Sequence, residues 1–64
     1  MDLDQLPSVM TPPQLAGYLQ TTPAALAQDR YLGRGVPYTR VGRRIRYLKE
    51  DILKYLENNK IGAA

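Results

Sequence analysis

Four arginines stand among the eight residues of the stretch RVGRRIRY, residues 40–47, and no acidic residue lies between them. An arginine guanidinium is planar and permanently charged, and its fork of five N–H donors matches the oxygens of a phosphate group and the base edges of a nucleic-acid groove. A solvated surface strand usually carries charges of both signs. The stretch therefore predicts an anionic partner.

The basic side chains are concentrated in one segment of the chain. Residues 30–49 hold seven basic residues and no acid, while the other residues hold two bases and six acids, although the net charge of the whole chain is only +3. Such a run can simply solvate a hairpin. Because six of the seven are arginines, the pattern favours nucleic acid as the partner. A protein-interaction module whose basic hairpin binds an acidic protein remains the alternative outside the nucleic-acid binders.

Composition argues against catalysis. A chain of 64 residues forms one small domain, in which a deep catalytic cleft is not expected. It has no cysteine and no histidine, and its only serine, Ser8, has no base to activate it. Glu50 and Asp51 are explained by the start of a helix. We therefore expect no enzyme, no catalytic residue, no metal, no cofactor and no small-molecule ligand.

The first ten residues, MDLDQLPSVM, bear on location. They have acids where a secretory signal would have basic residues, and the apolar runs of the chain are too short to span a bilayer. The expectation is a soluble protein of the cytoplasm with no membrane partner.

Two helix starts follow each other closely. In TPPQLAGYL, Thr11 is a suitable N-cap, Pro12 suits the first helical position and Gln14 completes a capping box, so a helix is predicted that ends near Gln20. In TTPAALAQ, Thr22 and Pro23 repeat the pattern. Two short helices with so short a connection must cross steeply, as in a helix-turn-helix.

The second helix has little apolar surface. Leu26 is its one large apolar residue before the helix ends, and it should anchor the second helix to the first. The alanines around it would let the exposed face approach another surface closely, although alanine also simply favours helix. Gly33 and Gly35 should end the helix.

Residues 36–47 alternate as a β-hairpin does. Gly42 is compatible with a two-residue type II′ turn, which would pair Val41 with Arg44. A three-residue loop would instead pair Val41 with Ile45 and place Arg40 and Arg46 together on the outer face. We favour the three-residue loop, or an equivalent bulge, because it matches the apolar faces. In either register Arg43 and Arg44 project from the tip.

A last helix is expected from about residue 49 to residue 58, with Glu50 and Asp51 in its first turn, where the helix dipole favours acids. The predicted fold is α+β: one domain over residues 1–64, with three helices and a two-stranded antiparallel hairpin between the second and third helices. Residues 1–8 are expected to form a loosely ordered lead-in, with Leu6 and Val9 able to lie on the core, and residues 60–64 a loose tail.

Three motifs, TPAALAQ, RVGRRIRY and the pair ED before the last apolar stripe, occur in this order and spacing. Over roughly residues 9–57 the chain resembles the phage excisionases, also called recombination directionality factors, which are small winged helix-turn-helix domains related to the DNA-binding domains of MerR-type regulators. One residue departs from the pattern: Asp29 stands where many relatives have tryptophan. Asp29 should therefore need a partner such as Arg30 or Arg34, and Tyr18 or Tyr31 should fill the missing volume.

The resemblance implies a function. An excisionase bends attachment-site DNA and contacts the phage integrase, so that DNA recombination is directed toward excision of the prophage from the bacteriophage's host chromosome. Such a protein would be associated with the nucleoid of the bacterial host cell, and its copies would associate cooperatively on double-stranded DNA. The second helix would enter the major groove and the wing the minor groove. The DNA-binding residues implied are Thr22, Pro23, Ala25, Gln28, Arg30, Arg34, Arg40, Arg43, Arg44 and Arg46. A small transcriptional regulator of the same fold is the alternative, because the same domain serves both roles.

Overall fold

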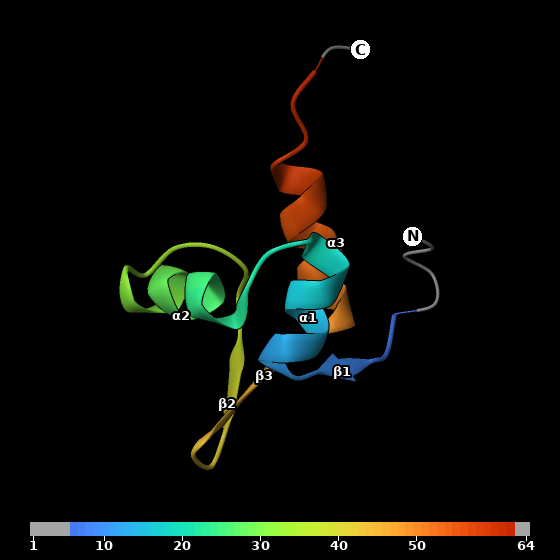
Figure 1. Ribbon diagram of the computed structural model, residues 1–64. Helices are drawn as coiled ribbons and strands as arrows, with labels where there is room; N and C mark the ends of the chain where they lie inside the picture. Colours follow the sequence, from blue (N-terminus) through green and yellow to red (C-terminus); the bar gives the residue numbers. More distant parts are fainter. Residues whose placement is uncertain (1–5, 63–64) are drawn as a thin grey trace.

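The computed structural model describes residues 6–62. Along the chain the elements are β1 (Val9–Met10), α1 (Pro12–Leu19), α2 (Pro23–Tyr31), β2 (Thr39–Val41), β3 (Arg44–Leu48) and α3 (Lys49–Asn58) (Figure 1). The α+β class and the three helices are confirmed. The sheet differs from the prediction, because it has three antiparallel strands in the order β1-β3-β2 instead of two.

The capping pattern at the start of α1 is confirmed. The hydroxyl of Thr11 accepts a hydrogen bond from the Gln14 amide at 3.3 Å, and the Gln14 side-chain oxygen accepts one from the Thr11 amide at 3.0 Å. The helix ends at Leu19, close to the predicted position, and its C-cap residue Gln20 adopts a left-handed conformation with φ 56°. These bonds satisfy amides that have no partner within the helix, so the local sequence alone specifies where α1 begins.

The start of α2 follows the same rule. The Thr22 hydroxyl accepts a hydrogen bond from the Ala25 amide at 3.1 Å, and Pro23 occupies the first helical position. Leu26 is buried, as predicted for the anchor of this helix. Figure 1 shows α2 running across the direction of α1 after a tight turn. The turn and the single anchor together leave most of the α2 surface outside the core.

The N-terminal segment belongs to the core from Leu6 onward. Leu6 is buried and Met10 is fully buried, and β1 pairs with β3 through Val9 with Leu48 and Met10 with Tyr47. Val9 is half exposed, so the expectation that it lies on the core is wrong, and Met10 takes that place. The cause is strand alternation, since pairing opposite Tyr47 turns Met10 inward and Val9 outward. Of the loose lead-in expected over residues 1–8, residues 1–5 lie outside the described residues, whereas Leu6 is buried and the Ser8 carbonyl accepts a hydrogen bond from the Lys49 amide.

The hairpin register also differs from the favoured prediction. Val41 pairs with Arg44 and Arg40 with Ile45, around a two-residue turn at residues 42–43. Gly42 has φ 63° whereas Arg43 does not have a positive φ, which is the type II′ pattern. If the face that holds Val41 were buried, it would have favoured the pairing of Val41 with Ile45. Val41 is instead 58% exposed. The turn therefore determines the pairing here, and the prediction from apolar faces was wrong.

The core gathers where β1, β3, α1 and α3 meet. Its largest fully buried side chains are Tyr47, Met10, Leu15 and Ile52. Helix α3 follows β3 directly and spans the predicted residues, with Glu50 and Asp51 in its first turn. After it, residues 59–62 extend away from the rest of the described chain (Figure 1), and Ile61 is exposed. Residues 63 and 64 of the expected tail lie outside the described residues.

Two glycines give substitutions of opposite effect. Gly35 has φ 89°, and an added Cβ would lie 2.8 Å from the Asp29 Cβ, so Gly35→Ala should destabilise the protein by at least about 1–2 kcal/mol from backbone conformation alone. Gly17 lies in α1 with open space around it, so Gly17→Ala should stabilise the protein by about 0.5–1 kcal/mol. Thermal melts of both variants check the prediction, and equal melting temperatures would contradict it.

Candidate nucleic-acid interface

The exposed face of α2 carries most of the residues predicted for the major groove. Thr22, Pro23, Ala25 and Gln28 are all exposed, whereas Leu26 is buried. Helical spacing places Ala24, Gln28 and Tyr31 in one exposed row at positions i, i+4 and i+7.

Tyr31, at the end of this row, was not predicted as a site residue. It is 86% exposed, so it does not fill the space of the missing tryptophan. The signal available in the sequence was its spacing, because Tyr31 follows Gln28 by three residues on a helix whose one large apolar residue before Tyr31 is Leu26. Tyr18, the other residue considered for that space, is half-buried and packs against the core.

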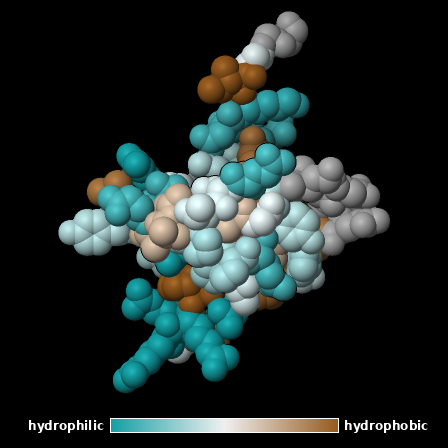
Figure 2. All heavy atoms as spheres, in the orientation of Figure 1, coloured by the Kyte–Doolittle hydropathy of each residue, from teal (hydrophilic) through white to brown (hydrophobic). Residues whose placement is uncertain are grey.

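The hairpin presents its arginines at the end of a projecting finger. Arg43 occupies the turn and Arg44 the first position of β3, and both are exposed. Figure 2 shows hydrophilic side chains gathered over the end of the hairpin, which Figure 1 shows extending away from the three helices. The prediction that these two arginines lie at the tip is confirmed.

Arg40 and Arg46 lie on opposite faces of the hairpin, which corrects the prediction that both line its outer face. Residues paired across two strands share a face, so Arg40 lies with Ile45, and Arg46 lies with Thr39. Arg40 is exposed, whereas Arg46 is half-buried and donates a hydrogen bond to the Ile45 carbonyl at 2.7 Å. The two-residue turn is the reason, since it shifts the register by one residue and flips one strand's side chains.

Arg30 is held by two tyrosines. Its Nη1 donates a hydrogen bond to the Tyr47 hydroxyl at 2.6 Å, and its guanidinium carbon lies 5.9 Å from the Tyr38 ring centre and 6.0 Å from that of Tyr47. The two rings meet edge to face at 6.5 Å. Arg30 is half-buried, unlike the arginines of the tip. The guanidinium therefore has a fixed place in the fold before any ligand binds.

Arg34 forms an ion pair with Asp29, with 3.2 Å between Nε and Oδ1. Arg34 is one of the two partners expected for Asp29. Gly35 lies against the Asp29 side chain. The Arg34 side chain is 68% exposed, so the pair contributes little to stability and its guanidinium stays accessible.

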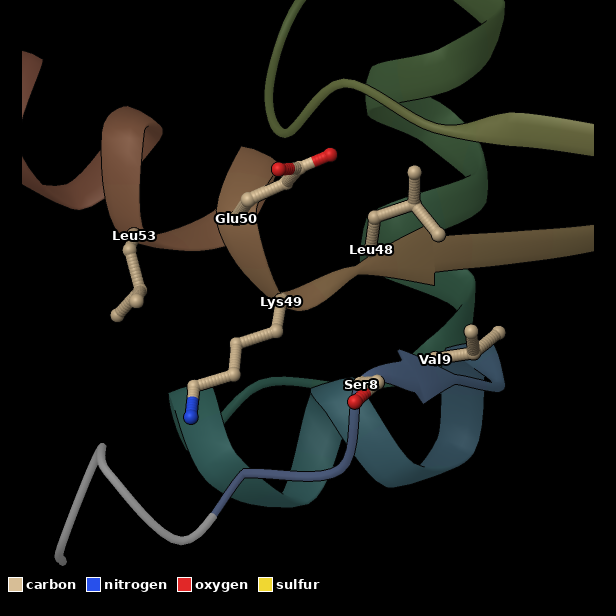
Figure 3. A pocket seen from close by; sticks show the side chains of 6 residues that line it. All are labelled: Ser8, Val9, Leu48, Lys49, Glu50 and Leu53. Carbon is tan, nitrogen blue, oxygen red and sulfur yellow. The ribbon is translucent and has the colours of Figure 1, made fainter.

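An apolar groove lies on the other face of the sheet from Arg30. It encloses about 450 Å³, and its lining consists of Ser8, Val9, Leu48, Lys49, Glu50 and Leu53 (Figure 3). Val9 and Leu48 are cross-strand partners and so share a face, opposite the face of Met10 and Tyr47. Figure 3 shows the Lys49 and Glu50 side chains leaving the start of α3 in opposite directions. None of the hairpin arginines lines this groove.

Residues 6–62 lack the features of two other kinds of site. Within residues 6–62, histidine, cysteine and acidic side chains form no group of three that could hold a metal ion. Over the same range, no helix combines the length and apolar character that crossing a membrane requires. The chemistry that stands out is that of cationic donors on a projecting hairpin, in a chain that also has an exposed helix face.

Comparison with protein-family models, with curated proteins and with solved structures finds no match to this chain.

Proposed function

We propose that this protein is a DNA-binding, DNA-bending excisionase with a winged helix-turn-helix arrangement, in which α2 is the recognition helix and the β2–β3 hairpin is the wing. The observation that carries the proposal is the pair Arg43 and Arg44, exposed at the tip of a hairpin that extends away from the helices (Figure 1), together with the exposed row of α2. This arrangement offers one element to each of two neighbouring grooves. Permanent positive charge at such a tip suits the polyanionic backbone of DNA.

The exposed row of α2 suits a major groove. That groove is about 12 Å wide and admits an α-helix, and the alanines of α2 keep the helix surface narrow. Gln28 supplies an amide able to make a bidentate contact with adenine, which discriminates by about 1–3 kcal/mol. Tyr31 adds a ring for a thymine methyl group and a hydroxyl for a phosphate. Because so few side chains of α2 can contact base edges, one copy has low sequence specificity.

The hairpin suits a minor groove. That groove, about 6 Å wide, admits the side chains of the tip but not both strands, and its negative potential attracts arginine where it narrows. Arg40 and Arg44 leave the hairpin from opposite faces. With the tip in the groove, these two side chains would face the two phosphate backbones that flank it. The observed register thus suits this binding mode better than the one predicted from the sequence.

DNA shape and phosphate contacts would then supply most of the binding. Five neutralised phosphates correspond to a log-log salt slope of about −4.5. A single copy binds weakly on this account, and adjacent copies bind cooperatively and bend the DNA. The protein would act in the cytoplasm of a bacterial host, where it contacts a phage integrase and promotes prophage excision without making a covalent change itself.

A gel-shift titration on attachment-site DNA from the source genome, with circularly permuted probes, tests the proposal. The expected result is a ladder of complexes whose bend increases with the number of copies bound. One unbent complex on promoter DNA, with none on the attachment site, would favour a transcriptional regulator. No binding to any duplex at low salt would reject DNA binding and favour a module that binds an acidic protein.

A further inference from the structure

We propose that Arg30 is a positioning residue, which sets the direction of α2 relative to the hairpin through Tyr47, and that it is not a phosphate contact. Its importance for DNA binding rests on the proposed function. The orientation itself is a property of the free protein and is measured without DNA.

Helix α2 has few anchors to the rest of the described chain. Leu26 is the buried residue of this helix, and one apolar contact leaves a short helix able to pivot about it. Arg30 lies four residues later, on the same side of the helix and about 6 Å further along its axis. Two points of attachment define an axis, whereas one does not. Arg30 is the second point.

The second anchor reaches the strand that forms half of the hairpin. Tyr47 lies in β3, 17 residues along the chain from Arg30, and its side chain is only 1% exposed. A buried tyrosine hydroxyl needs a hydrogen-bond partner, and the Arg30 guanidinium supplies it at 2.6 Å. The Tyr38 ring, which is edge to face with Tyr47, lies within cation–π range on the β2 side. Arg30 thereby connects α2 with the base of both hairpin strands.

There is room for the helix to move if this connection is lost. A concavity of about 380 Å³ borders Arg30, Arg34 and Tyr38 along the loop that leads from α2 to β2. Without the Tyr47 hydroxyl the guanidinium can turn toward this open space. We therefore expect α2 to sample a range of directions when the hydrogen bond is removed, while its own helical structure persists.

The decisive variant is Tyr47→Phe, which removes one hydroxyl and keeps the ring. Tyr47 is too deeply buried to touch DNA, so any effect on DNA binding must pass through the fold. Tyr18→Phe is the matched control, because Tyr18 is half-buried and belongs to α1. Residual dipolar couplings of backbone amides in the free protein give the orientation of α2 relative to β3. In Tyr47→Phe the α2 couplings should no longer fit the parent orientation, while those of α1 still fit. Unchanged α2 couplings would overturn the proposal.

The DNA experiment separates positioning from phosphate contact. Arg30→Met removes the charge and keeps much of the length, and duplex affinity is measured across salt concentrations at a temperature at which every variant is folded. If Arg30 acts by positioning α2, Tyr47→Phe and Arg30→Met should both bind the duplex several-fold more weakly than the parent protein, with the same salt slope. The double variant should then bind no more weakly than Arg30→Met alone. If Arg30 instead contacts a phosphate, Arg30→Met should make the log-log salt slope shallower by about 0.9, while Tyr47→Phe should bind with the parent affinity. That result would overturn the proposal. If the parent protein binds no duplex, the proposed function fails, and the dipolar couplings still decide the role of Arg30.

Discussion

Replacing both Arg43 and Arg44 with alanine should lower the affinity for duplex DNA of any sequence by at least about tenfold and make the log-log salt slope shallower by about 1.8. Both side chains are exposed at the hairpin tip, and neither forms part of the core. The loss therefore comes from two cationic contacts with DNA and not from unfolding. Fluorescence-anisotropy titrations at several salt concentrations measure the affinity and the slope together.

The control for this variant removes the same charge elsewhere. Lys54 on α3 and Lys60 in the tail are both exposed, so Lys54→Ala with Lys60→Ala lowers the net charge by the same two units. That variant should bind DNA with nearly the parent affinity and slope. Equal losses in the two double variants would mean that only overall charge matters, and the assignment of the hairpin tip as the binding element would be wrong.

The helices were predictable because their start signals are local. Thr11 with Gln14, and Thr22 with Pro23, satisfy or replace helix amides within three residues of chain, so no distant part of the molecule needs to be known. The exposed tip arginines were predictable for a similar reason, since either hairpin register leaves them at the turn. The bond between Arg30 and Tyr47 was not predictable, because its partners are far apart in sequence and meet only in the folded chain.

The hairpin register shows which of two signals prevails when they disagree. Apolar alternation favoured pairing Val41 with Ile45, whereas Gly42 favoured pairing Val41 with Arg44. The turn prevailed because Val41 projects beyond the core and is 58% exposed, so turning it away from Ile45 costs little. Burial becomes complete only nearer the base of the hairpin, at Tyr47, whereas Ile45 is only partly buried. A hairpin that extends past its core takes its register from its turn.

Strand β1 was missed because two residues cannot display a period. Its importance is testable through Met10, which is fully buried beside Tyr47. Met10→Ala should destabilise the protein by about 3 kcal/mol, through lost burial and the cavity that remains. For a domain of this size, that corresponds to a fall in the melting temperature of roughly 12–24 °C. Urea and thermal unfolding followed by circular dichroism measure both quantities.

The neighbouring Val9 provides the matched control, because it lies in the same strand but faces outward and is half exposed. Val9→Ala should cost less than about 1 kcal/mol, since the side chain already contacts solvent. A large difference between the two variants requires β1 to be docked on β3 with Met10 inward. Similar small losses would mean that this segment contributes little to the fold, as a loosely attached lead-in would. The comparison distinguishes a three-stranded sheet built on the N-terminal segment from a two-stranded hairpin alone, because only the former places Met10 in the core.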